Sequence, residues 1–378
     1  MKIAFAYDVP YPWHVGGIES MNRNEAEELA KNNEVHFFTT KWKGMNAEFS
    51  DNRIHYHAAH ETDQSMIYRH GRRSIREALR YKFSLLRMFG YKFDVVVTNA
   101  FPIIHMSVIK LYCRMNGSKL IVEVAEVWDR DYWRSYLGPV IGDMAYFLSK
   151  WEISGADFYV VISSTTAEKL LKFGVEKSKI KIFAPGLDNN MIETARRDNA
   201  KRDKLVVFSG RLIKEKRLDK WLIALHKAIE MDNSIKGLII GNGPERQAIR
   251  EQIKKTGMSR NVKLVKPYKS SMELYRTIRR SSALLHMSER EGLGIIAIES
   301  IALDTPVILP KYTPIPKEVK DMCIVSDEED IPSKILEIVN SNDKSQYIRH
   351  TKNLDMYSKS KVNSFYGALF RKITGSIR

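Results

Sequence analysis

The stretch His286-Met-Ser-Glu-Arg-Glu-Gly-Leu-Gly-Ile-Ile-Ala-Ile-Glu-Ser-Ile-Ala-Leu-Asp-Thr-Pro-Val-Ile-Leu-Pro310 places two glutamates, Glu291 and Glu299, eight positions apart across a glycine loop. Glycines let the backbone come close to a ligand, and the composition from Ile295 to Leu303 predicts a helix that begins directly after them. Apolar segments typical of strands precede the loop and follow the helix. A strand, a glycine loop, a helix and a second strand, in this order, indicate a nucleotide-type site in an open parallel sheet.

This loop has the groups that bind phosphates and sugar hydroxyls. Its free amides and the positive end of the helix dipole favour an anion or a hydroxyl-rich group. The carboxylate of Glu291 can accept hydrogen bonds from sugar hydroxyls, and Glu299 can do the same for a second polyol such as a ribose. Pairs of glutamates at this spacing also occur on solvated helix faces, so the interpretation depends on the surrounding strands.

With those surroundings included, nearly the whole chain resembles the family-four retaining glycosyltransferases, enzymes of the GT-B fold that use nucleotide-sugar donors. The resemblance implies an α/β fold with two Rossmann-like, doubly wound domains facing across a cleft and a C-terminal helix that crosses back to the first domain. The signature of the family is two Glu separated by seven residues, a Ser three positions before the first Glu, and Pro-Val after the helix. The matching residues are Ser288, Glu291, Glu299, Pro306 and Val307.

Length and composition agree with two soluble α/β domains. The chain has 378 residues, of which 44% are hydrophobic and 28% charged, and this length favours two cores over one. Strand and helix signals alternate in both halves, which predicts parallel, doubly wound sheets. We expect an N-terminal acceptor-side domain at 1–188, a C-terminal donor domain at 189–355, and a C-terminal helix at 356–378 that packs back on the first domain.

The compartment follows from the cysteines and from the first residues. Only Cys113 and Cys323 are present, in different halves, so the sequence contains no disulfide framework. The apolar run at the start is too short for a secretory signal and reads as a first strand. No apolar segment approaches the length of about 20 residues that a membrane-spanning helix needs. We therefore expect a cytoplasmic protein.

The net charge of +16 indicates an anionic partner. The segment from Arg69 to Lys92 is strongly basic, and apolar residues recur through it at helical spacing. Such a helix can lie on an anionic bilayer, which would put the chain peripherally at the cytoplasmic face of the membrane. The same pattern is equally typical of a helix that packs on a core, and periodicity does not separate the two. No nucleic-acid-binding module appears, so nucleic acid is not an expected partner. The apolar residues are Ile75, Leu79, Phe83 and Leu86.

Two cations follow an apolar strand and lead into a helix. In the segment Ser209 to Lys216, the resemblance gives Arg211 and Lys216 the role of contacting the donor diphosphate. There they would neutralise the charge that grows on the leaving group as the glycosidic bond breaks. Members of the family usually have Gly where this chain has Arg217. This departure bears on the backbone geometry of the turn and not on the two cations.

Glycine turns supply the other predicted donor contacts. Gly16 and Gly17 follow the first strand, and the family has a Gly-Gly loop here beside the donor phosphate. Gly243 lies in a loop that borders the nucleotide in the family, although a tight turn explains it equally well. Around Glu291, the amides of Leu293, Gly294 and Ile295 complete the expected contacts to the sugar.

The clearest departure from the family lies after the strand that ends at Val124. Many members have a His-Asp pair here, with the His near the primary hydroxyl of the sugar, whereas this chain has Ala125 and Glu126. We predict that Glu126 takes over a polar contact in the site. Trp128 and Trp133 are candidates to line the acceptor side, but buried aromatic residues are the commoner explanation.

We expect no metal and no cofactor besides the donor, which is a substrate. His55, His57 and His60 lie near Glu61 in the sequence, but no second cluster completes a metal site. The resemblance implies a retaining transfer in which the departing phosphate helps to take the acceptor proton. The expected acceptor is a glycan or a lipid-linked glycan, in the synthesis of glycolipids, lipid-linked glycans or surface polysaccharides. The alternative is a noncatalytic GT-B-like subunit that binds a polyanion or a membrane. Neither the base nor the sugar of the donor follows from the sequence.

Overall fold

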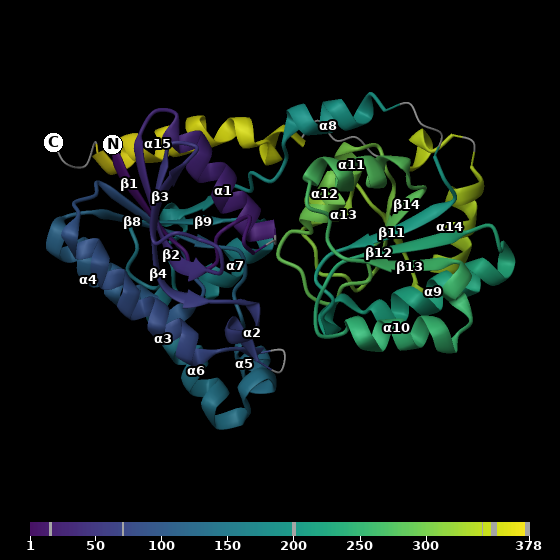
Figure 1. Cartoon of the computed structure of the whole chain (residues 1–378), viewed down its shortest axis with the longest axis horizontal. Coiled ribbons are helices and arrows are strands. Elements are labelled where there is room, and N and C mark those ends of the chain that lie inside the picture. Colours follow the sequence, from purple (N-terminus) through teal and green to yellow (C-terminus); the bar gives the residue numbers. More distant parts are fainter. Residues whose placement is uncertain (15–16, 70–71, 199–201, 342, 349–353, 375–378) are drawn as a thin grey trace. The chain divides into compact units, whose positions relative to one another are not determined.

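The computed structural model describes residues 1–14, 17–69, 72–198, 202–341, 343–348 and 354–374. The chain divides into two compact units, each with its own sheet (Figure 1). The first unit consists of Met1–Pro185 together with the C-terminal segment that begins at Lys359, and the second consists of Gly186–Ser358.

The first unit is built on an eight-stranded sheet with the order β10-β9-β8-β7-β1-β2-β4-β3. Its strands pair in parallel except for β3, which runs antiparallel to β4. The chain winds outward from β1 first in one direction and then in the other, as in a doubly wound sheet. The strands are β1 (Lys2–Ala6), β2 (Glu34–Trp42), β3 (Glu48–Asp51), β4 (Ile54–Thr62), β7 (Val95–Asn99), β8 (Lys119–Val124), β9 (Phe158–Val161) and β10 (Ile180–Ile182), with a separate pair β5 (Tyr68–Arg69) and β6 (Arg72–Arg73).

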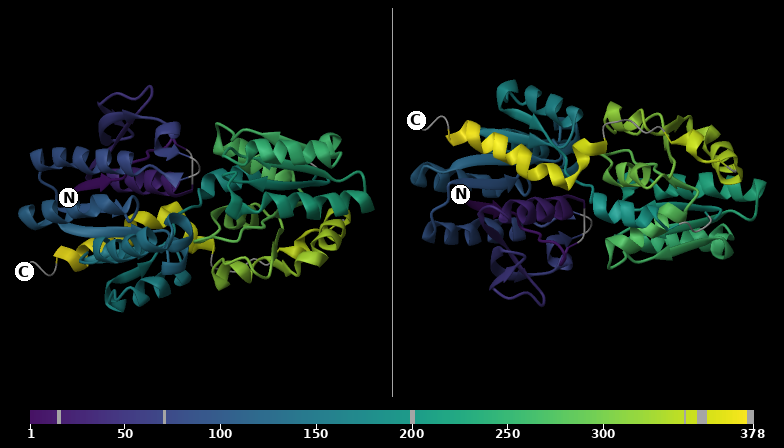
Figure 2. Two further views of the ribbon diagram at one scale, coloured as in Figure 1. Left: turned by 90° about the horizontal axis from the view of Figure 1, so that it is seen from below. Right: turned by 90° about the horizontal axis from the view of Figure 1, so that it is seen from above.

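Helices cover both faces of this sheet (Figure 2). Successive side chains of β1 point to opposite faces, so Ile3 and Phe5 enter one core cluster while Ala4 and Ala6 enter the other. The helices are α1 (Gly17–Ala30), α2 (Gln64–Ile67), α3 (Ile75–Ser84), α4 (Met106–Asn116), α5 (Arg130–Leu137), α6 (Pro139–Ile153), α7 (Ser164–Lys172) and α15 (Val362–Thr374), with the 3-10 turns η1 (Leu85–Gly90), η2 (Ile103–His105), η3 (Lys177–Lys179) and η9 (Lys359–Lys361).

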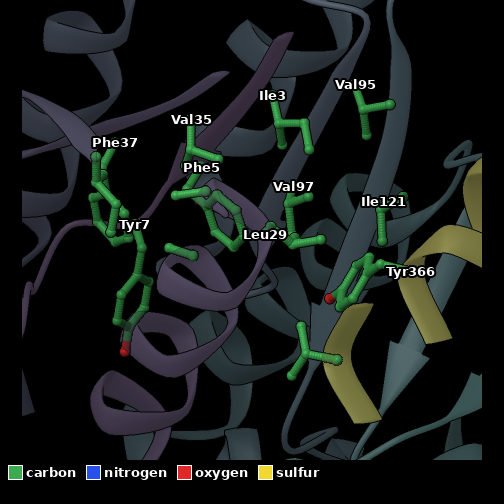
Figure 3. Close-up of a cluster of buried hydrophobic side chains, with 14 of the residues drawn as sticks. Ile3, Phe5, Tyr7, Leu29, Val35, Phe37, Val95, Val97, Ile121 and Tyr366 are labelled. Carbon is green, nitrogen blue, oxygen red and sulfur yellow. The ribbon is translucent and has the colours of Figure 1, made fainter. Parts of the chain in front are cut away.

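The last helix, α15, belongs to the first unit although the whole second unit lies between it and the rest of that unit in the sequence. Its apolar residues pack on the side of the sheet that α1 covers. Figure 3 shows Tyr366 of α15 in the cluster that also contains Ile3, Phe5 and Ile121. Leu369, Phe370 and Ile373 complete this contact, which confirms the predicted helix that crosses back.

The second unit has a six-stranded parallel sheet with the order β13-β12-β11-β14-β15-β16. Its core includes the fully buried Trp221. The strands are β11 (Leu205–Ser209), β12 (Lys236–Ile240), β13 (Val262–Val265), β14 (Ala283–Leu285), β15 (Val307–Pro310) and β16 (Ile324–Ser326). The helices are α8 (Asn189–Arg196), α9 (Leu218–Met231), α10 (Arg246–Lys255), α11 (Ser271–Arg280), α12 (Ile295–Ala302), α13 (Lys317–Lys320) and α14 (Ile331–Asn340), with η4 (Lys214–Lys216), η5 (Met258–Arg260), η6 (Glu328–Asp330), η7 (Ser345–Tyr347) and η8 (Leu354–Tyr357).

The predicted fold class is thus confirmed, whereas one local expectation needs correction. The basic segment from Arg69 to Lys92 is not one helix, because β5, β6, α3 and η1 divide it. Among the described helices, none combines the length and the apolar character that crossing a bilayer would require.

Two buried carboxyl groups lie where α15 meets the sheet. Glu25 of α1 and Glu123 of β8 are both buried, and the Tyr366 hydroxyl donates a hydrogen bond to Glu123 and lies 3.5 Å from Glu25 Oε2. Burial, with the nearby charge of Glu123, raises the pKa of Glu25 well above its usual range. Glu25 therefore keeps its proton to a higher pH than an exposed glutamate does.

This arrangement predicts that the stability of the first unit falls as the pH rises. A carboxyl group whose pKa is raised on folding contributes its stability below about pH 4.5, its unfolded value, and loses that contribution as the pH rises through the folded pKa. Glu25→Gln keeps a neutral donor, so at pH 8 it should melt about 2–4 °C above the wild type, and the gap should close toward pH 5. Thermal melts across this pH range test the idea, with the exposed Glu61→Gln as the matched control. A gap that does not change with pH would contradict it.

Candidate active site

The two central strands of the second sheet bring distant loops together. β11 pairs in parallel with β14, with Val206 opposite Ala283 and Val207 opposite Leu284. From β11 the chain first winds outward through β12 and β13, and it then returns to the other side of β11 with β14. Ligands of open parallel sheets bind outside the carboxyl ends of the strands at such a reversal of strand order. The loop after β11 and the loop after β14 both leave from this edge.

An ion pair joins these two loops. Lys216, at the end of η4, forms a short ion pair with Glu291, and His286 Nε2 lies 3.0 Å from the same carboxylate oxygen. The Glu291 side chain is only 13% exposed. Burial alone would raise the pKa of Glu291, but the charge of Lys216 and the approach of His286 outweigh it and hold that pKa well below its usual range. The carboxylate is therefore ionised and held in one place.

The backbone of η4 holds the start of the glycine loop. The carbonyl oxygen of Glu215 accepts hydrogen bonds from the Glu289 amide, at 2.9 Å, and from the Ser288 hydroxyl, at 3.2 Å. The Ser288 hydroxyl also approaches the Arg290 carbonyl oxygen at 2.8 Å. This Ser of the signature therefore links two loops, and no ligand is needed to explain it.

Arg217 occupies the left-handed conformation, with φ +49° and ψ +48°. Glycine adopts this conformation without steric cost, which explains why the family usually has Gly here. In this chain the Arg217 guanidinium pairs with Asp219 at 2.8 Å and also with Glu289. The turn is thus preserved, and its side chain adds a further link between the two loops.

The glycine loop ends at Gly294, which is the N-cap of α12 and has φ +79°. A Cβ atom at this position would lie 3.2 Å from Ile315 Cγ2, so both the backbone and the space favour glycine. Leu293 is buried, whereas Ile295 is partly exposed. The first amides of α12 have no intrahelical acceptor, as expected for the predicted contacts to a sugar or phosphate.

Glu299 lies on α12 in a different environment from Glu291. The Tyr275 hydroxyl of α11 donates a hydrogen bond of 2.9 Å to it. Burial raises the pKa of Glu299 to about 7, and the bond from Tyr275 offsets only part of that effect. Near neutral pH, this carboxyl group therefore exists in both protonation states.

Arg211 and Gly243 belong to the loops after β11 and β12. Arg211 is exposed, and its guanidinium makes no ion pair or hydrogen bond with any residue that the structure describes. Gly243 has a packing role, because a Cβ atom there would lie 2.4 Å from the Leu212 carbonyl oxygen. The two loops are also joined by a bond of 2.9 Å from the Leu212 amide to the Asn242 carbonyl oxygen. A direct contact of either residue with the donor stays a prediction.

The remaining predicted residues lie in the first unit. Gly17 begins α1 at the carboxyl edge of the sheet, whereas Gly16 lies outside the described residues. Glu126 is partly buried two residues after β8. Beside it, Trp128 contacts Trp133, with 4.6 Å between ring centroids, and Trp133 is buried while Trp128 is partly exposed. The structure therefore joins Lys216 with Glu291, but it does not test the roles of Glu126 and Gly17.

Sequence reasoning assigned no role to two polar residues of this site. His286 lies at the end of β14 and reaches Glu291, and Tyr275 comes from α11 to reach Glu299. The position of His286 at the carboxyl end of a strand was a usable signal, whereas nothing in the sequence linked Tyr275 to Glu299. Across the described ranges, no group of three or more His, Cys, Asp or Glu residues could hold a metal ion.

Comparison with known proteins shows two family matches that together cover most of the chain. Residues 15–190 match the model described as Glycosyltransferase Family 4, and residues 191–353 match Glycosyl transferases group 1. The boundary between the two matches falls close to the boundary between the two structural units.

Relatives with assigned names are distant. A D-inositol 3-phosphate glycosyltransferase of Segniliparus rotundus is 24% identical over 39% of this chain and 35% of its own length. CapM of Staphylococcus aureus, a capsular polysaccharide biosynthesis glycosyltransferase, is 23% identical over 44% of this chain and 47% of its own length. The chain therefore matches less than half of either relative.

A solved structure shows the fold more completely. The Escherichia coli protein described as "Trehalose-6-phosphate", bound with UDP-2-fluoro glucose, superimposes with a TM-score of 0.74 over 98% of both chains, at 11% identity. At this identity the likeness concerns the fold alone.

The buried ion pair predicts the effect of removing its cation. Lys216→Met leaves the Glu291 carboxylate buried without its cation and should lower the free energy of unfolding by about 1–3 kcal/mol. Because the pKa of Glu291 is depressed, this loss should be complete above about pH 4.5 and should shrink as the pH falls. Denaturant unfolding of the second unit measures it, with the exposed Lys214→Met as the matched control. The double change Lys216→Met/Glu291→Gln should recover part of the loss, and a double variant as unstable as the sum of both single changes would argue against the pair.

Proposed function

The chain belongs to the family-4 glycosyltransferases of the GT-B fold, and from this premise we propose that it moves a sugar from a nucleoside-diphosphate sugar to an acceptor hydroxyl with retention at the anomeric carbon. The observation that carries the proposal is the ionised Glu291, held by Lys216 and His286 beside the N-terminus of α12. A carboxylate held in this way can accept hydrogen bonds from sugar hydroxyls without having to be ordered first.

In the proposed reaction the cations act on the diphosphate. Arg211 has no partner among the described residues, so its guanidinium is available for the two phosphates. Lys216 already holds Glu291 and would share its charge between that carboxylate and the leaving group. Such charges stabilise the negative charge that develops as the glycosidic bond breaks. The departing phosphate would then help to take the acceptor proton, with Glu126 as a polar contact on the side of the first unit.

The expected pathway is the synthesis of glycolipids, lipid-linked glycans or surface polysaccharides. This part of the proposal is supported by the names of two relatives, a capsular polysaccharide enzyme and an inositol phosphate glycosyltransferase. A UDP-sugar is the first donor to test, because a protein of similar fold binds UDP-2-fluoro glucose. The second candidate is a noncatalytic subunit with the same fold. It is favoured by Ala125 and Glu126, which stand where many members of the family have His and Asp.

A donor screen tests the proposal. The purified chain is tested against UDP-, GDP- and ADP-sugars by thermal shift and by product formation. Arg211→Ala should lower turnover at least about 100-fold while the melting temperature without donor is unchanged, because the side chain is exposed and acts only on the developing charge. Lys214→Ala, an exposed cation in the same segment, should keep full turnover. Near-normal turnover of Arg211→Ala would contradict its role, and the absence of both a shift and a product with every donor would favour the noncatalytic subunit.

The pKa of Glu299 gives a second prediction, on the pH dependence of nucleotide binding. If the ribose hydroxyls donate to Glu299, binding favours the ionised carboxylate and lowers its pKa from the free value of about 7. Affinity for the nucleoside diphosphate should therefore rise with pH up to about 7 and level off above it. Titration calorimetry from pH 5.5 to 8.5 measures the effect, and Glu299→Gln should bind more weakly and lose that part of the slope. An identical slope in both proteins would exclude Glu299 from ribose binding.

A further inference from the structure

Helix α6 of the first unit has its polar and apolar faces exchanged. Its buried residues are Gly142, Ser149, Glu152 and Ile153, three of which are small or charged. Large apolar side chains instead lie on the exposed face. A helix on the surface of a soluble protein normally turns its apolar stripe toward the core, so α6 presents an apolar face that the described residues leave uncovered. The exposed residues are Val140, Ile141, Met144, Phe147, Leu148 and Trp151, each between 41% and 71% exposed.

Contacts on the buried face of α6 explain why its apolar residues face outward. Gly142 lies against α5, where a Cβ atom would be 2.5 Å from the Trp133 carbonyl oxygen, so only glycine permits this close packing. Glu152 lies 4.0 Å from Lys110 of α4, which also stacks on Trp151, 4.5 Å from the ring centroid. These contacts fix the rotation of α6 about its axis. The exposed apolar residues from Val140 to Trp151, here called the apolar arc of α6, therefore stay on the surface.

The neighbouring helices also expose large apolar side chains. Helices α3 and α4 contact each other, and both α3 and α6 pack on η2. On α4, Leu111 is 51% exposed and Met115 68% exposed. The apolar residues of α3 and η1 that the sequence singled out are exposed as well, so they do not form the core-packing stripe that was one of the two interpretations. They are Ile75, Leu79, Phe83 and Leu86, between 41% and 65% exposed.

The charge on these three helices is positive. Together α3, α4 and α6 carry six basic residues against three acidic ones. Each acid is already engaged: Glu77 by Arg80 at 3.2 Å, Asp143 by α5 arginines at 2.6 and 2.7 Å, and Glu152 by Lys110. The basic residues are Arg76, Arg80, Lys82, Lys110, Arg114 and Lys150.

We propose that the exposed face of α6, with the adjoining faces of α3 and α4, is a docking surface for an anionic lipid bilayer. The apolar arc of α6 enters the boundary between headgroups and acyl chains, with α6 parallel to the membrane plane. Lysine and arginine side chains at its border reach the anionic headgroups through their long stems. A second copy of this chain fits less well, because a symmetric dimer would bring together two surfaces of the same positive charge.

This surface goes beyond the proposed function, because it concerns where the protein lies and not what it transfers. Binding is therefore measured without any donor or acceptor, and the result does not depend on whether the chain is a transferase.

The experiment is co-sedimentation of the full chain with vesicles of phosphatidylcholine containing about 30% phosphatidylglycerol, compared with pure phosphatidylcholine. The wild type should bind the anionic vesicles more strongly, and less so in about 0.5 M than in about 0.05 M salt. Met144→Glu/Phe147→Glu should weaken binding at least about tenfold, because two apolar side chains no longer enter the bilayer. Ile223→Glu/Met231→Glu on α9 is the matched control, since it adds the same charge at apolar positions that are also more than half exposed, and it should bind like the wild type.

Both α6 positions are exposed, so the double variant should keep the melting temperature of the wild type. If the melting temperature of the double variant falls, the single variant Phe147→Ser takes its place in the vesicle assay. Equal binding by the wild type and the α6 variant would overturn the proposal, and so would a wild type that does not bind anionic vesicles at low salt. A concentration-dependent dimer that the α6 variant abolishes, without vesicle binding, would instead assign this face to a second copy.

Discussion

The parallel pairing of β11 with β14 is the constraint on which the candidate site depends. Parallel strands point their carboxyl ends to one edge, so the loops that follow them meet although 75 residues separate Lys216 from Glu291. The reversal of strand order at this pair leaves the edge open above both strands. The ion pair, the bonds to the Glu215 carbonyl oxygen and the pair between Arg217 and Glu289 all depend on this adjacency.

One short segment gives two glutamates opposite electrostatic properties. Glu291 has a cation and a histidine beside it, so it is held ionised. Among the described residues, the Glu299 carboxyl group has only the Tyr275 hydroxyl as a hydrogen-bond donor, and its pKa is about 7. The first is suited to a permanent contact with hydroxyl donors. The second gains its charge most easily when a ligand supplies hydrogen bonds, so it can respond to binding.

In the first unit, the amphipathic helices α15 and α6 pack in opposite ways. The apolar side of α15 completes the core over β1, β7 and β8, so a helix from the end of the chain covers a face that the sequence before it leaves open. Helix α6 does the reverse, since a glycine contact and an ion pair hold its small and polar residues inward and leave its apolar residues exposed. Both helices are amphipathic, and only their packing partners show which one belongs to the core.

Much of this protein could be predicted from its sequence. The alternating strands and the two doubly wound sheets follow from local periodicity and glycine turns, and the resemblance carried by the motif of fixed spacing added the returning helix and the expected role of Glu291. These features depend on residues close to one another in the chain. Tertiary structure alone decided that Lys216 meets Glu291, that Tyr275 reaches Glu299, that Gly243 packs on Leu212, and that the apolar residues of α3 and α6 face outward. Each of these depends on which distant strands and helices become neighbours, and the sequence period of an amphipathic helix is the same whether its apolar face meets a core or a membrane.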